Sequence, residues 1–92
     1  SCTSGIRLKS LAVKAYPNPV NRGEVVYVDA DLEDSLLKNA IIEVYNSSGV
    51  KVQEVRVAER ITPVTLRSNS GTYIFIFRND QGYTKELKII KQ

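Results

Sequence analysis

Histidine is absent from the 92-residue sequence, and cysteine occurs once, at Cys2. Histidine is the commonest general base at neutral pH and the commonest metal ligand, so the sequence excludes catalytic triads and zinc sites. A single cysteine allows no internal disulfide and no metal site built from thiolates. We therefore expect no catalytic residue, no cofactor and no bound metal, and we do not expect the domain to be an enzyme.

The sequence also lacks long apolar runs, blocks of like charge and glycine-rich loops. No stretch approaches the roughly 18–20 apolar residues that a membrane-spanning helix needs. The 13 Lys and Arg residues are interleaved with 10 Asp and Glu residues, which leaves a net charge of +3 and disfavours nucleic acid as a partner. The glycines after residue 10 are single and fall at expected turns, which excludes a phosphate-binding loop.

Acidic residues do gather in one segment, at Asp29, Asp31, Glu33 and Asp34. Paired carboxylates can serve a glycosidase, and loop oxygens can bind calcium. This run lacks the glycine and the spacing of an EF-hand loop, so a solvated acidic surface is the preferred interpretation. Calcium binding stays open as the alternative.

Short runs rich in Val, Ile, Tyr, Phe and Thr alternate with turn residues from Leu11 onward, at intervals of roughly 8–12 residues. About seven runs are expected to form strands, over residues 12–16, 24–30, 40–45, 50–58, 63–66, 72–77 and 83–91. Almost every connection is a turn, and no strand–helix–strand pattern occurs. The sequence predicts an all-β, immunoglobulin-like antiparallel β-sandwich of about seven strands.

Residue patterns refine two of these strands. In residues 24–30 the alternation places Val26, Val28 and Ala30 on one face, and the face that ends in Asp29 should be the wetter one. Residues 72–77 carry large apolar groups on both faces, which predicts a central strand.

Two irregularities are expected as well. Leucines in residues 31–39 fit a helical turn capped by Asp31, but the segment is too short to be stable alone, and we interpret it as a loop that crosses between the sheets. Val52 and Val55 lie an odd number of positions apart, so a β-bulge near Gln53 and Glu54 would realign them.

The N-terminal residues 1–11 are small, polar and basic, which predicts a linker from the preceding part of a longer protein; a weakly patterned strand is the alternative. The absence of methionine agrees with a chain cut from a longer one. The five tyrosines fall on expected strands, where packing is preferred over sugar binding. Residues 12–92 would form the domain itself.

Three patterns occur in an order that resembles a known family. Tyr16-Pro17-Asn18-Pro19 precedes a turn, residues 42–52 form a hairpin around Gly49, and Gly71-Thr72-Tyr73-Ile74-Phe75 is followed by Gly82 and Lys88-Ile89-Ile90-Lys91-Gln92. Together they resemble the C-terminal sorting domains of the type IX secretion system of certain Gram-negative bacteria, over residues 13–92. The residues expected to carry the sorting signal are Tyr16, Pro17, Asn18, Pro19, Gly49, Gly71, Tyr73, Gly82, Lys88, Ile89, Ile90, Lys91 and Gln92.

The resemblance implies an address and not a catalyst. Such a domain rides at the C-terminus of a cargo, crosses the periplasm folded and docks on the outer-membrane translocon. In many cargoes a sortase-like peptidase then removes it, and the mature protein is joined to anionic lipopolysaccharide at the cell surface or is secreted. Here cleavage would fall between Thr3 and Ser10, where an extended backbone suits a protease.

We expect the partner to recognise residues 83–91 and 72–77, by edge pairing or surface docking. Exposed edges would also allow a strand-exchanged dimer of the isolated domain. One alternative is an immunoglobulin-like interaction or carbohydrate-binding module of a cell-surface protein, which would use exposed tyrosines and the acidic loop. A purely structural spacer is the other.

Overall fold

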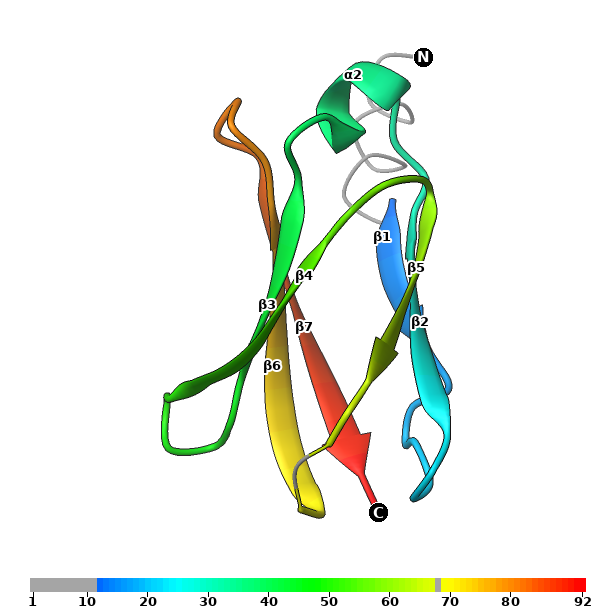
Figure 1. The fold of residues 1–92 in the computed structure, drawn as a ribbon, viewed down its shortest axis with the longest axis vertical. Coiled ribbons are helices and arrows are strands. Elements are labelled where there is room, and N and C mark those ends of the chain that lie inside the picture. The colour runs from blue at the N-terminus through cyan, green and yellow to red at the C-terminus, as the bar shows by residue number, and fades with distance from the viewer. Residues whose placement is uncertain (1–11, 68) are drawn as a thin grey trace, which may run out of the picture.

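The computed structural model describes residues 12–67 and 69–92, and within them seven strands and one short helix form a sandwich (Figure 1). The elements are β1 (Val13–Tyr16), β2 (Val25–Ala30), α2 (Asp34–Leu37), β3 (Ile41–Tyr45), β4 (Lys51–Arg56), β5 (Ile61–Thr65), β6 (Gly71–Arg78) and β7 (Thr84–Lys91). The linker expected over residues 1–11, with its cleavage segment, lies outside the described residues.

Two antiparallel sheets face each other in Figure 1, one with the order β1-β2-β5 and the other with the order β4-β3-β6-β7. This arrangement confirms the predicted immunoglobulin-like sandwich. The two expected hairpins are also confirmed, since β3 pairs with β4 and β6 pairs with β7 along most of their lengths. β6 lies between β3 and β7, so the strand with two apolar faces is central as predicted.

The core lies between the sheets and follows the period-two pattern of the strands. On β2 the inward residues Val26, Val28 and Ala30 are at most 1 % exposed. On β6 the inward residues include Phe75 and Phe77, and full burial of each such ring stabilises the fold by roughly 1.5–3 kcal/mol. Alternation between core and solvent therefore fixes which face of each strand remains available to a partner.

Two local expectations need correction. The extra residue of the β-bulge is Val52, one position before the predicted pair, because Val44 pairs with Gln53 while Tyr45 pairs with Lys51. Residues 31–40 do cross from one sheet to the other, but the helical turn follows Glu33, without the predicted cap by Asp31 or any side-chain cap bond.

The outer face of β2 is the wetter one, as predicted, although one of its residues is buried. Tyr27 is exposed there as expected, but Asp29 is only 6 % exposed. The reason is an ion pair across the sheet, since Asp29 Oδ1 lies 2.7 Å from Arg60 Nε. The arginine covers the carboxylate and supplies the partner that a buried charge requires.

No described residue belongs to a helix that is long and apolar enough to cross a membrane; the helix over Asp34–Leu37 has four residues.

Candidate functional site at the end of the last strand

Asn18 bonds directly to the backbone of β7, although 70 positions separate it from Lys88. Its side-chain Nδ2 donates a hydrogen bond to the Lys88 carbonyl at 2.9 Å, and its Oδ1 accepts one from the Ile90 amide at 3.0 Å. A carboxamide carries a donor and an acceptor like those of a peptide group, so it can pair with a strand edge as another strand would. Asn18 therefore takes the place of a neighbouring strand at the edge of β7.

Val20 extends this pairing towards the end of the chain. Its amide donates to the Ile90 carbonyl at 2.8 Å, and its carbonyl accepts from the Gln92 amide at 2.9 Å, which makes a short parallel bridge with Lys91. The Val20 side chain is fully buried. The segment after β1 thus ties the three-stranded sheet to the end of the four-stranded one.

The prolines on either side of Asn18 lie in a turn that cannot continue a sheet ladder. Both follow cis peptide bonds, Tyr16–Pro17 and Asn18–Pro19. A proline nitrogen has no hydrogen to donate, so Pro17 and Pro19 end β1 without leaving backbone donors unpaired. The four-residue motif therefore ends one strand and presents the Asn18 side chain to another.

Tyr73 holds the loop that precedes β6, the strand beside β7. It lies near the start of β6, opposite Ile89, and its side chain is buried. Its hydroxyl donates a hydrogen bond to the carbonyl of Asn69, four residues upstream. Immunoglobulin-like sandwiches use such a tyrosine corner to hold the connection between their sheets. The motif Gly71-Thr72-Tyr73 in the sequence did not indicate this bond.

Gly71 belongs to the same end of the molecule, because it pairs with Lys91. The end of β7 alternates between core and solvent: Ile89 is buried, whereas Ile90 is 43 % exposed and Lys88 points to the same outer side. Figure 1 shows the C-terminus at the end where β7 finishes. Segments from the early and late parts of the sequence that carry the family resemblance therefore meet at this end of the molecule.

Three of the predicted signal residues lie elsewhere. Tyr16 points to the outer face of the three-stranded sheet, where its ring lies 6.0 Å from that of Tyr27. Gly49 and Gly82 lie in the β3–β4 and β6–β7 turns with φ of 80° and 85°, a conformation that glycine adopts most readily. Both glycines lie at turns, as predicted, and both belong to hairpin loops outside the end of β7.

Gln53 closes the opposite side of the sandwich, a contact that sequence reasoning missed. Its Nε2 donates to the Thr65 carbonyl at 2.9 Å, and its Oε1 accepts from the Arg67 amide at 3.4 Å. These bonds join β4 of one sheet to β5 of the other. The β-bulge expected beside Gln53 was the only sequence signal near it.

Two carboxylates of the acidic segment pair with Arg60, and the segment does not converge on a common ligand position. Arg60 pairs with Asp29 and also lies 3.5 Å from Asp31. The hydrogen bond to Asp29, followed by the charges of Asp29 and Asp31, raises the pKa of the Arg60 guanidinium. Across residues 12–67 and 69–92, no group of three or more His, Cys, Asp and Glu side chains is arranged to hold a metal ion.

A second carboxylate, Glu43, is buried on the outer face of the four-stranded sheet. It lies 3.0 Å from Lys51 Nζ and 3.2 Å from Arg78 Nε, and Lys51 also bonds Glu54. The hydrogen bonds that the Lys51 ammonium donates to Glu54 and then to Glu43 raise its pKa. No pattern in the sequence indicated the two partners of Glu43.

Comparisons with known proteins bear on the family and the fold of the chain. The sequence profile of the family described as the secretion system C-terminal sorting domain matches residues 14–92. The curated proteins contain no match. Among solved structures, the chain is similar to PorZ, an essential bacterial surface component of the type IX secretion system of Porphyromonas gingivalis, with a TM-score of 0.75 and 14 % identity.

The similarity to PorZ covers 97 % of this chain and 12 % of the PorZ chain, and at this identity it shows the fold alone. The profile match shows the family as well, and the matched residues include Asn18, Tyr73 and the final strand. The chain therefore belongs to the family of type IX secretion system C-terminal sorting domains.

Proposed function

We propose that this domain is the sorting signal of a cargo protein, read by the outer-membrane type IX translocon at the end of β7. The observation that carries the proposal is the contact between Asn18–Val20 and Lys88–Gln92. Four hydrogen bonds join these two segments, two through the Asn18 side chain and two through the Val20 backbone. The domain acts as an address and not as a catalyst, whatever the activity of the parent protein.

The cargo passes through the periplasm in the folded state and reaches the cell surface or the medium. A sortase-like peptidase then removes the domain, and anionic lipopolysaccharide is joined to the mature cargo. Because β7 is an edge strand of its sheet, a partner strand can pair with its first half, Thr84–Leu87, without displacing Asn18. The same edge would support a strand-exchanged dimer of the isolated domain.

A fusion tests sufficiency. Residues 1–92 are placed behind a signal peptide and a fluorescent protein, and expressed in a type IX-competent bacterium and in a translocon mutant. Fluorescence at the surface or in the medium of the competent strain alone is the expected result. Retention in the periplasm of both strains would show that these residues are not a sufficient signal.

A matched pair of surface variants tests the location of the signal. Ile90 and Ile61 are 43 % and 42 % exposed, at the end of β7 and on the other sheet. Ile90→Glu keeps the bonds to Asn18 and Val20, because those use backbone atoms of Ile90. We expect Ile90→Glu to block export and Ile61→Glu to leave it unchanged. Equal export of the two variants would exclude this part of β7 as the contact.

One observation favours a second function, a carbohydrate-binding module. Tyr16 and Tyr27 are each 42 % exposed and stand side by side on the outer face of the three-stranded sheet. Adjacent exposed rings can stack on sugars. Glycan-array binding that is lost in Tyr16→Ala and Tyr27→Ala, with export unaffected, would support this function.

A further inference from the structure

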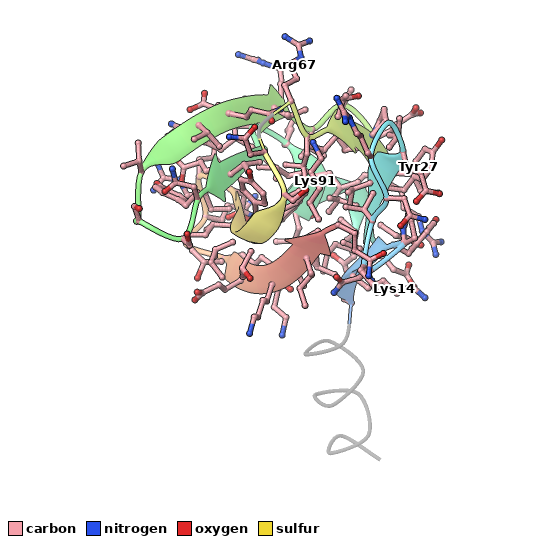
Figure 2. The ribbon with its side chains drawn as sticks, turned by 90° about the horizontal axis from the view of Figure 1, so that it is seen from below. Lys14, Tyr27, Arg67 and Lys91 are labelled. Carbon is pink, nitrogen blue, oxygen red and sulfur yellow. The ribbon has the colours of Figure 1, made fainter. Side chains whose placement is uncertain are left out.

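Three cationic side chains from distant parts of the chain surround one hollow at the C-terminal end of the sandwich. Arg22 lies in the β1–β2 turn, Arg67 follows β5, and Lys91 ends β7. With Asn69 and Ser70 they line a depression of about 260 Å³. Figure 2 looks onto this end and shows Arg67 and Lys91 on it. No acidic side chain is among these lining residues.

The positions of these residues are held by contacts outside the hollow. The bonds of Val20 to Ile90 and Gln92 hold the end of β7 against the segment that leads to Arg22. The Lys91 ammonium bonds the Leu66 carbonyl at 2.9 Å, and the Tyr73 hydroxyl bonds the Asn69 carbonyl. Leu66 is therefore tied to the end of β7, and Asn69 to β6, before any ligand arrives, which reduces the entropy lost on binding.

The two arginines at this hollow take part in no ion pair among the described residues. In the part of the chain that the structure describes, the five ion pairs involve Lys51, Arg60 and Arg78, and none includes Arg22 or Arg67. The positive charge of the two guanidiniums is thus available to an anion. A concave site of one sign concentrates the field more than scattered surface charges do.

The donor set suits phosphate better than carboxylate. A guanidinium presents a planar fork of N–H groups that binds either anion in bidentate fashion. A carboxylate has two oxygens, which a single arginine can satisfy, whereas a phosphate presents three or four. Two arginines, the Asn69 amide and the Ser70 hydroxyl together offer donors on several sides of the hollow.

We propose that this hollow, lined by Arg22, Arg67 and Lys91 with Asn69 and Ser70, is a binding site for a phosphate group. The phosphate is either free or part of a phosphorylated lipid headgroup. This property goes beyond the sorting function and does not depend on it, because it belongs to the isolated chain.

The test uses the full 92-residue chain, with inorganic phosphate and lipid vesicles as probes. Titration with phosphate is followed by amide NMR, and saturable shifts are expected in residues 67–71 and 91–92. The double variant Arg22→Gln/Arg67→Gln should weaken the affinity about tenfold or more, since hydrogen bonds between charged groups are lost. Lys91 is left intact because its bond to Leu66 supports the loop.

The control variant is Lys14→Gln/Arg56→Gln, which removes the same charge from exposed positions on other strands. It should change the affinity less than about twofold, because distant exposed charges are screened. Equal weakening by both double variants would reduce the effect to net charge and overturn the site. Absence of saturable shifts with phosphate, together with absence of vesicle binding, would overturn it as well.

Vesicles separate the two sources of phosphate. Co-sedimentation is compared for phosphatidylcholine vesicles with and without phosphatidic acid. Binding that requires phosphatidic acid and is lost in Arg22→Gln/Arg67→Gln assigns the site to a lipid headgroup. NMR shifts with inorganic phosphate but no vesicle binding assign it to free phosphate. Both results support the phosphate site, and neither bears on whether the domain directs export.

Discussion

The two open sides of the sandwich are each closed by one amide side chain, but not with equal strength. On the β1–β7 side, Asn18 makes bonds of 2.9 and 3.0 Å, and Val20 adds two backbone bonds. On the β4–β5 side, Gln53 makes bonds of 2.9 and 3.4 Å. The side that carries the family signature is therefore the more firmly closed.

The difference has a physical origin in the flanking residues. Asn18 lies between two prolines, whose rings fix their φ angles near −65°, so its segment loses little conformational entropy when the bonds form. Gln53 has a longer side chain with more rotamers to lose, a cost of up to about 2 kcal/mol for a glutamine. The same functional group therefore stabilises the fold more at position 18 than at position 53.

The largest effect is expected for Asn18→Ala. It removes two hydrogen bonds to β7 and loosens the adjoining Val20 bridge, so the free energy of unfolding should fall by about 2 kcal/mol. Urea denaturation measures this, and hydrogen exchange of the Ile90 amide should accelerate as well. A loss below about 0.5 kcal/mol would remove the basis of the comparison, since such a value is typical of an ordinary surface residue.

Tyr73→Phe comes next, because it deletes the bond between the Tyr73 hydroxyl and the Asn69 carbonyl while keeping the ring in the core. We expect a loss of about 1 kcal/mol, seen as a lower midpoint in thermal unfolding. Tyr27→Phe is the control, because the Tyr27 ring is exposed, and it should change stability by less than about 0.5 kcal/mol. Equal effects of the two substitutions would argue against a tyrosine corner.

Gln53→Ala should have a smaller effect, about 0.5 kcal/mol, because one of its bonds is long and the side chain regains rotamer freedom when released. Urea denaturation under the conditions used for Asn18→Ala gives a direct comparison of the two losses in the free energy of unfolding. If Gln53→Ala proved as destabilising as Asn18→Ala, the two sides would be equivalent and the prolines would add nothing.

The smallest expected effect is the coupling free energy between the β1–β7 side and the β4–β5 side. Asn18 and Gln53 bond different strands and share no partner. Their effects should add within about 0.5 kcal/mol in the double variant, as is usual for independent sites. A larger coupling in this double-mutant cycle would mean that the sheets move together when either side opens.

The strands and their core faces could be predicted because alternation is a local property of the sequence. The two apolar faces of residues 72–77 identified the central strand, and turn residues identified both hairpins. The predicted position of the bulge was wrong by one residue. A slip in alternation shows that a strand has an extra residue, but it does not show which residue is unpaired. The predicted sorting family is confirmed by the profile match.

The bonds of the site could not be predicted, because they join residues far apart in the sequence. Nothing near Asn18 indicates that its amide bonds Lys88 and Ile90, and nothing near Asp29 indicates Arg60 as its partner 31 positions later. Such pairs depend on how the two sheets are placed against each other. The family resemblance named both ends of the signal but gave no reason for them to touch.

The contact between Asn18 and the end of β7 exists only after the chain has folded. A receptor that recognises residues 18–20 together with residues 88–92 would bind a folded tail and pass over an unfolded one, although both have the same sequence. The sorting domain would then provide a quality control for its own folding, since the export machinery would not bind a misfolded one.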